Sequence, residues 1–260
     1  MKVSPPPVQV MAAWSSDHAA VRLCDGALAT PTVKLKPFLE SNVVRAWKGC
    51  GPWTSRTVTI PIVSPAGAHV LSVVIQIPKY DVWHLSILDP EGAVCFARIE
   101  SNKPTQFLTS SAPVPIQWGG AHFGQVGLGD SKKREHGLSR LLCFDSPTVR
   151  AQGPTDSIAY AEDISNTRNK LEDYGVTFTL CFLGIFCFMA LDSYPWEYHI
   201  KNRFGEKIGS TGAAAGCKYG SDTVVHLGDM TQEQRRLALA AVVYDVARVV
   251  SADPGAGGGG

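Results

Sequence analysis

A run of apolar residues near the end of the chain, at residues 235–251, predicts a helix. From Leu237 to Tyr244 every residue is apolar, so a helix here has no polar face. A helix that is apolar on all sides is stable when other elements surround it. Asp229 or Thr231 can cap its start, and the polar residues that follow suit a first turn. The pattern therefore indicates a buried C-terminal helix.

A membrane-seated helix is the alternative interpretation of the same run. A spanning helix needs about 20 mostly apolar residues. Here Asp245 and Arg248 follow the apolar block, one turn apart, where their side chains can pair on the helix surface. We therefore expect protein to enclose this helix, and we assign structural roles to Tyr244, Asp245 and Arg248.

Short segments rich in β-branched and aromatic residues alternate with glycine-containing turns over much of the chain. Strands are predicted on this pattern at residues 57–63, 69–77, 82–88, 93–99, 196–202, 207–211 and 223–227. Residues 176–191 are the most hydrophobic run, and large apolar side chains recur there at every second position. This period predicts a long core strand, or two strands bent at Gly184. A re-entrant membrane segment is the alternative.

A single enclosed helix in a β-rich chain constrains the architecture, because a sheet surrounds a helix only by closing into a barrel. We predict a mainly β fold in which a closed antiparallel barrel encloses the C-terminal helix. In this interpretation residues 56–252 form the barrel, and 119–175 are a loop-rich insertion within it. The proline- and glycine-rich residues 1–55 form an irregular arm or a wrapped extension with one or two short strands, and the glycine-rich residues 253–260 form a flexible tail.

Composition narrows the class of protein. Apolar residues make up 45% of the chain, which is enough for a sizeable core. The balance of 24 basic and 23 acidic residues leaves a net charge of +1, which argues against a nucleic-acid binder. The cysteine count is odd, at 7, and no CxxC pair occurs, as is typical of reduced thiols inside cells. We expect an intracellular protein that is cytoplasmic or peripheral to a membrane.

Motifs that carry chemistry are missing from the sequence. It contains no G-x-S-x-G nucleophile elbow, no phosphate-binding loop and no HExxH metal motif. His84 and His199 occupy similar positions in two predicted hairpins and could face one another. We interpret them as hydrogen-bonded strand residues rather than as a metal-binding or catalytic pair. The expectation is a protein that is not an enzyme and that uses no cofactor and no metal ion.

Two groups of basic residues are candidate contacts with an anionic lipid surface. One group surrounds the turn of the last predicted hairpin, and the other is a run in the loop-rich segment. The two groups are Lys201, Arg203 and Lys207, and Lys132, Lys133 and Arg134. A Lys or Arg close to an anionic membrane contributes about 1 kcal/mol to binding. The alternative for both groups is an ordinary solvated turn or loop.

The last 60 residues or so combine several features in a fixed order. A hairpin at 198–209 precedes a strand at 223–227, the turn Gly228–Met230, and a terminal helix that contains Val243-Tyr244-Asp245. This order resembles the tubby C-terminal-like superfamily, and within it the phospholipid scramblases and their LURP-one relatives. The segment 85–99 resembles the first-half hairpin of the same fold.

The resemblance implies a twelve-stranded barrel around a central C-terminal helix. Tubby-like domains bind phosphoinositide head groups through basic strand and loop residues. Scramblases are described as using an acidic calcium-binding segment before the terminal helix. The corresponding residues 216–229 here contain only Asp222 and Asp229, too few for the six to eight oxygen ligands that calcium prefers. Calcium is therefore not expected.

Two functions follow from these features. The first is a non-enzymatic scramblase-like or tubby-like module that binds an anionic lipid surface or a protein partner. The alternative is a structural accessory subunit of a large macromolecular assembly, with the barrel as scaffold and with residues 1–55 and 119–175 as docking surface. Protein partners or a larger complex, and anionic phospholipid, are the expected partners; nucleic acid is not.

Overall fold

The computed structural model describes residues 13–14, 18–36, 56–77, 83–100, 112–129, 148–162, 197–213 and 222–252. Its strands are β1 (Ala13–Trp14), β2 (Thr32–Leu35), β3 (Arg56–Val63), β4 (His69–Ile77), β5 (His84–Leu88), β6 (Val94–Glu100), β7 (Val114–Trp118), β8 (Ala121–Leu128), β9 (Val149–Gln152), β10 (Ser157–Glu162), β11 (Glu197–Asn202), β12 (Lys207–Ala213) and β13 (Thr223–His226). Its helices are α1 (His18–Leu28) and α6 (Gln232–Ala252).

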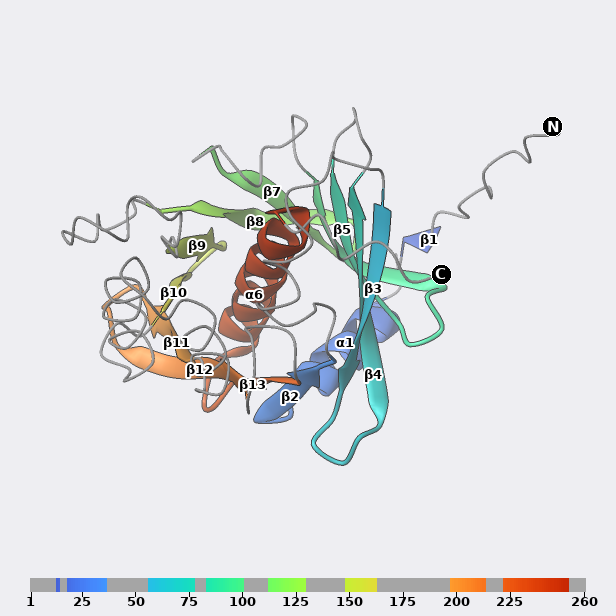
Figure 1. Ribbon diagram of the computed structural model, residues 1–260, viewed down its shortest axis with the longest axis horizontal. Helices are drawn as coiled ribbons and strands as arrows, with labels where there is room; N and C mark the ends of the chain where they lie inside the picture. Colours follow the sequence, from blue (N-terminus) through green and yellow to red (C-terminus); the bar gives the residue numbers. More distant parts are fainter. Residues whose placement is uncertain are drawn as a thin grey trace, which may run out of the picture.

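The strands β2 to β13 form a closed antiparallel barrel of 12 strands (Figure 1). Each strand pairs with the next one along the chain, and the pairing of β13 with β2 completes the ring. The short strand β1 lies outside this ring and pairs in parallel with the first residues of β6. The predicted fold class, a closed antiparallel barrel around a C-terminal helix, is confirmed.

The helix α6 runs along the inside of the barrel (Figure 1). From Leu237 to Ala247 no residue is more than 1% exposed. The helix contacts β4, β5, β8, β9 and β10, which belong to different parts of the ring. The barrel interior therefore covers every face of the apolar run, which is the reason that this sequence is stable as a helix without a polar side.

The start of α6 is a reciprocal capping box. The backbone N–H of Gln234 donates to the Thr231 hydroxyl at 3.2 Å, and the Thr231 N–H donates to the Gln234 side-chain carbonyl at 2.9 Å. These bonds satisfy backbone N–H groups that a helix start leaves without partners. Thr231 is thus the cap, one of the two residues that the sequence offered.

All five turns described between adjacent strands lie at one end of the barrel, which we call the turn end. They join β3 to β4, β5 to β6, β7 to β8, β9 to β10 and β11 to β12, and alternation of strand direction brings them to the same end. The helix α6 begins at this end as well, and α1 lies beside its first turns (Figure 1). Cys24 and Leu28 of α1 are fully buried and extend the core there.

Two domain predictions need correction. The N-terminal segment 1–55 is not only an irregular arm, because it supplies the helix α1, which was not predicted. Its barrel strand β2 agrees with the short strands expected there. The segment 119–175 is not only a loop-rich insertion, because the ring strands β8, β9 and β10 lie within it. These strands are short or glycine-containing and carry little periodic signal. The ring nevertheless needs them, because β8, β9 and β10 fill the gap between β7 and β11 in the strand order.

The predicted hairpin strands at 57–63, 69–77, 82–88, 93–99, 196–202, 207–211 and 223–227 are confirmed, with ends that shift by a few residues. The hydrophobic run 176–191 and the tail 253–260 lie outside the described residues. Neither described helix combines the length and the apolar character that crossing a lipid bilayer requires.

Candidate functional site

Three turns at the turn end share one geometry, and the comparison between them locates the candidate site. They are Ser64–Gly67, Asp89–Gly92 and Asn202–Gly205. In each, the first residue's side-chain oxygen accepts a hydrogen bond from the backbone N–H four positions on. The fourth residue is a glycine with φ between 75° and 87°, and its N–H donates to the carbonyl of the first residue. Glycine adopts this backbone conformation without strain.

The two central positions of these turns differ in chemistry. They hold Pro65-Ala66 in the first turn, Pro90-Glu91 in the second and Arg203-Phe204 in the third. Central turn positions of this kind accept most residue types, with proline favoured at the first of them. The hairpin geometry therefore requires neither an arginine nor a phenylalanine at 203 and 204.

Phe204 is the large hydrophobic side chain that the described surface exposes most, at 73%. The guanidinium carbon of Arg203 lies 4.8 Å from the centre of its ring, a cation–π contact. Arg203 also donates from Nη1 to the Thr155 carbonyl in the β9–β10 turn, at 3.4 Å. The tip of the β11–β12 hairpin thus presents an aromatic ring with a cation held beside it.

The structure brings the predicted basic residues Lys201, Arg203 and Lys207 together on this hairpin. Lys207 is partly neutralised, because its Nζ lies 2.8 Å from the Glu197 carboxylate. The hydrogen bond from Lys207 is the main reason that the pKa of Glu197 falls below its ordinary value. Among the described residues, Lys201 and Arg203 have no carboxylate partner. They are the cations that this tip can offer to a ligand.

The neighbouring β9–β10 turn is tied to the start of α6 by Glu233. Its carboxylate accepts hydrogen bonds from the Thr155 N–H at 2.9 Å, the Thr155 hydroxyl at 2.5 Å and the Asp156 N–H at 2.9 Å. Burial of Glu233 raises the pKa of this carboxyl, but the hydrogen bonds outweigh that effect and the pKa is lowered. A Cβ on Gly153 would lie 2.6 Å from this carboxylate, so a larger residue there would displace the Glu233 side chain from its present position.

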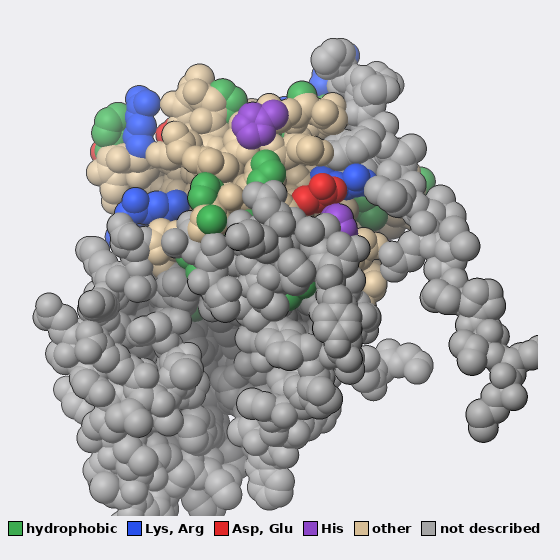
Figure 2. Space-filling model, turned by 90° about the horizontal axis from the view of Figure 1, so that it is seen from above, with side chains coloured by type: hydrophobic (Ala, Val, Ile, Leu, Met, Phe, Trp, Pro, Cys, Tyr) green, Lys and Arg blue, Asp and Glu red, His purple; other side chains and the backbone are tan. Residues whose placement is uncertain are grey.

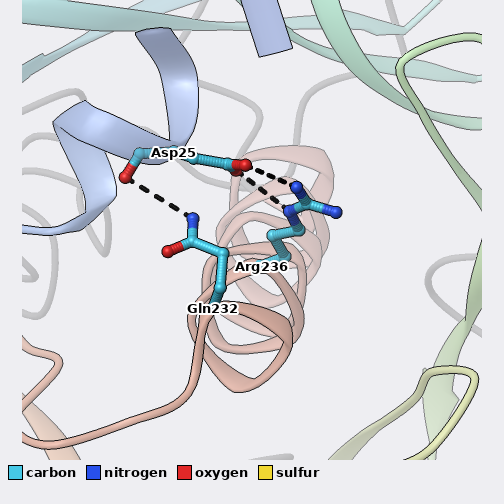
Figure 3. A network of polar contacts seen from close by, with 3 residues as sticks. All are labelled: Asp25, Gln232 and Arg236. Atoms are coloured by element: carbon cyan, nitrogen blue, oxygen red, sulfur yellow. Dashed lines mark hydrogen bonds and ion pairs between the residues drawn. The ribbon is translucent and has the colours of Figure 1, made fainter. Parts of the chain in front are cut away.

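A second polar network holds α1 against α6 (Figure 3). Arg236 donates to both carboxylate oxygens of Asp25, at 3.0 and 2.5 Å, and the Gln232 side-chain amide lies 3.5 Å from the Asp25 carbonyl. The Arg236 guanidinium also lies over the rings of Trp118 and Phe123, at 5.2 and 5.6 Å. These contacts join α1, α6 and the β7–β8 hairpin.

Arg235, one residue earlier, links the last carbonyl of α1 to the turn that precedes α6. Its guanidinium donates to the carbonyls of Leu28, Gly228 and Met230 at 2.5, 2.9 and 3.0 Å. Cys24 lies on the same helix and is buried, and desolvation raises the pKa of its thiol well above the ordinary value. The α1–α6 contact is thus a structural joint, and its thiol is held in the unreactive protonated form.

The structure does not show the similar hairpin positions predicted for His84 and His199, and it excludes the possibility that they face one another. They lie on β5 and β11, six strands apart in the ring of 12, so they are on opposite walls. Their neighbours Leu85 and Tyr198 are buried in the interior, which places both imidazoles on the outer face. His84 also precedes its turn by five residues (84 to 89), and His199 by three (199 to 202).

Both histidines lie beside a carboxylate. His84 Nδ1 is 3.4 Å from Glu100, and His199 Nε2 is 3.3 Å from Glu197. Asp222, one of two acids in the segment compared with a calcium site, forms an ion pair with Lys36 at 3.1 Å. Across the described ranges, no group of three or more His, Cys, Asp or Glu side chains is arranged to hold a metal ion.

Of the three residues of the terminal helix that were assigned structural roles, the structure describes the side chains of two. Tyr244 and Asp245 are buried in the barrel, at 0% and 1% exposure. The Arg248 side chain lies outside the described part, so its pairing with Asp245 stays a prediction. Lys132, Lys133 and Arg134 also lie outside the described residues.

In the described part of the face that Figure 2 shows from above, basic, acidic, histidine and hydrophobic side chains are interspersed, and no broad patch of one charge is seen. The sequence predicted the basic residues of the β11–β12 hairpin as candidate contacts, but it did not single out Phe204. The signal for Phe204 was an aromatic residue at a central turn position that the turn itself does not require.

Comparison of the chain with protein-family models, with curated proteins and with solved structures gives no match. The tubby-like and scramblase-like resemblance therefore stays a prediction, as does the alternative role of a structural subunit in an assembly.

Proposed function

We propose that this chain is a non-enzymatic binding module that attaches to an anionic phospholipid surface through the tip of its β11–β12 hairpin. One observation carries the proposal. Arg203 and Phe204 occupy the central positions of a turn whose two structural equivalents hold Pro65-Ala66 and Pro90-Glu91. Since the turn does not need them, their presence at an exposed tip is best explained by a ligand outside the chain.

The charge of the tip suits an anionic lipid. Lys201 and Arg203 have no carboxylate partner in the described part of the chain, whereas Lys207 is held by Glu197. Each such cation contributes about 1 kcal/mol near an anionic membrane, an interaction that salt screens over roughly 10 Å. The expected attachment is therefore moderate, reversible and sensitive to salt.

The scaffold keeps the tip in place. The strands β11 and β12 pair with each other and with β10 and β13, so the hairpin is part of the closed ring. Arg203 is further oriented by the Thr155 carbonyl, and Glu233 anchors the turn that carries Thr155 to α6. A preorganised tip loses little conformational entropy on binding, which favours recognition by few contacts.

Vesicle flotation of the full chain tests this proposal. The wild-type chain is expected to float with vesicles that contain phosphatidylserine or a phosphoinositide, and not with phosphatidylcholine alone. The double variant Lys201→Glu with Arg203→Glu reverses the charge of the tip and is expected to stay in the unbound fraction.

The matched control is Lys34→Glu with Arg150→Glu, which makes the same change in net charge on β2 and β9. This control is expected to float as the wild type does. Equal flotation of the two double variants, or no binding of the wild type to any anionic vesicle, contradicts the proposal.

A further inference from the structure

We infer that Phe204 is a membrane anchor whose ring enters the lipid interface and directs the turn end of the barrel toward the bilayer. This inference rests on the proposed function, because it assumes that the hairpin tip meets a lipid surface. It adds how the chain attaches and how the molecule is oriented on the bilayer. It also gives a role to Phe204, which attachment by charge alone would not use.

The first argument is the cost of leaving Phe204 in water. Its side chain is 73% exposed, although moving an aromatic ring of this size out of water is favourable. The Ser64–Gly67 and Asp89–Gly92 turns carry alanine and glutamate at the equivalent position. An exposed ring at this one tip is compatible with a function in which the ring leaves water on binding.

The second argument is the geometry of the ring and its cation. Arg203 lies 4.8 Å from the ring centre, so the guanidinium travels with the phenyl group. A long basic side chain keeps its charge in the headgroup layer while its apolar part lies deeper. A ring that enters the acyl boundary therefore leaves Arg203 level with the lipid phosphates. Basic residues beside an apolar face are the pattern of interfacial binding.

The third argument separates a lipid from a protein partner. A protein interface presents a contiguous apolar patch with several large side chains at its core. Phe204 is the single large hydrophobic side chain exposed on the described surface, and it projects from a turn flanked by Lys201 and Arg203. One ring on a projecting, cationic tip fits a fluid interface, which needs no complementary pocket.

The position of the hairpin defines the orientation. The β11–β12 turn belongs to the turn end, at which α6 also begins, and it lies across the barrel from the β5–β6 turn. The latter carries the acidic side chains of Asp89 and Glu91, which an anionic surface repels. Insertion of Phe204 therefore tilts the barrel onto the β11–β12 edge and lifts the acidic edge away from the lipid.

The test moves the ring without changing composition. Phe204→Glu with Glu91→Phe exchanges the two side chains between equivalent turn positions, and Phe204→Ser removes the ring. Binding of both variants to anionic vesicles is expected to weaken about tenfold, because roughly 1.4 kcal/mol of apolar transfer is lost. The binding that Phe204→Ser retains is expected to vanish at high salt, whereas part of the wild-type binding persists.

The variant Phe204→Trp, in the full chain, measures how deeply residue 204 enters the bilayer. The tryptophan fluorescence that this variant adds to that of the wild type is expected to shift to the blue on vesicle binding. Nitroxide groups on the acyl chains are expected to quench it. Glu91→Trp is the matched control at the equivalent turn position, and its added emission is expected to stay unquenched.

Two results overturn the inference while leaving the proposed function intact. In the first, Phe204→Ser binds as the wild type does, and the added tryptophan is not quenched, although Lys201→Glu with Arg203→Glu abolishes binding. In the second, the tryptophan is shielded without lipid and Phe204→Ser changes the sedimentation of the free chain, so that a second copy covers the ring. Loss of all vesicle binding by the wild type instead contradicts the proposed function itself.

Discussion

Glu233 joins the first turn of α6 to the β9–β10 turn through one carboxylate. Its three hydrogen bonds come from groups 77 or 78 residues away in the chain. Hydrogen bonds to a charged acceptor are stronger than neutral ones, and this acceptor also lies at a helix N-terminus, where negative charge is favoured. At the residue scale, the ionisation of Glu233 is therefore coupled directly to the fold.

Glu233→Gln is expected to lower the free energy of unfolding by roughly 1 kcal/mol at neutral pH. The folded-state pKa of Glu233 lies below its ordinary value of 4.5. The extra stability of the wild type is therefore fully present above pH 4.5 and is lost as pH falls through the folded-state pKa. Urea unfolding of both chains across this range measures the difference. A gap between the two chains that stays constant down to the most acidic pH contradicts the assignment.

Helix α1 is held by two buried side chains, Cys24 and Leu28, and by polar contacts with α6. Arg236 and Asp25 link it to α6, and Arg235 donates to its last carbonyl, that of Leu28. The two charged side chains of the Asp25–Arg236 pair are 19% and 21% exposed, so water screens their attraction only in part. Removal of one partner leaves the other desolvated without compensation. We therefore expect the pair to be strongly coupled.

Arg236→Ala is expected to destabilise the chain by about 2 kcal/mol, from the lost ion pair and the lost contacts with Trp118 and Phe123. Asp25→Ala and the double variant complete a thermodynamic cycle. The double variant is expected to cost less than the sum of the two single variants, and urea unfolding measures each. Additive effects would show that the two side chains do not interact in solution.

At the scale of the whole molecule, α6 is the core of the barrel rather than a helix packed on it. Its buried segment touches strands from several parts of the ring, and none of its residues from Leu237 to Ala247 is more than 1% exposed. Neighbouring strands of the ring are joined by backbone hydrogen bonds all the way around. A defect in α6 is therefore expected to weaken the whole barrel and not one hairpin.

Leu239→Ala is expected to lower the free energy of unfolding by about 3 kcal/mol, because it leaves a cavity in a closed interior that has little freedom to collapse. Helical and β-sheet signals are expected to be lost in one transition. Ala66→Ser, at an exposed turn, is the control and is expected to change stability by less than about 0.5 kcal/mol. Separate transitions for helix and sheet in Leu239→Ala would contradict the single-core description.

Much of the fold could be predicted from the sequence, because its determinants lie in neighbouring residues. An apolar block without a polar face requires enclosure, and alternating segments around glycine turns indicate hairpins. The ring itself required tertiary structure. The strands β2 and β9 have only four residues each, so the polar–apolar alternation that both contain is too short to predict a strand by itself. Their pairing depends on partners elsewhere in the chain.

The sequence by itself determined the buried helix, the two candidates for its cap, the major hairpins and the basic group on the last of them. Each of these depends on the type and spacing of nearby residues. Only the tertiary structure decided that His84 and His199 lie on opposite walls, that Arg236 meets Asp25 across 211 positions, and that Phe204 is exposed. These properties depend on which distant segments share a surface, and local spacing does not encode that.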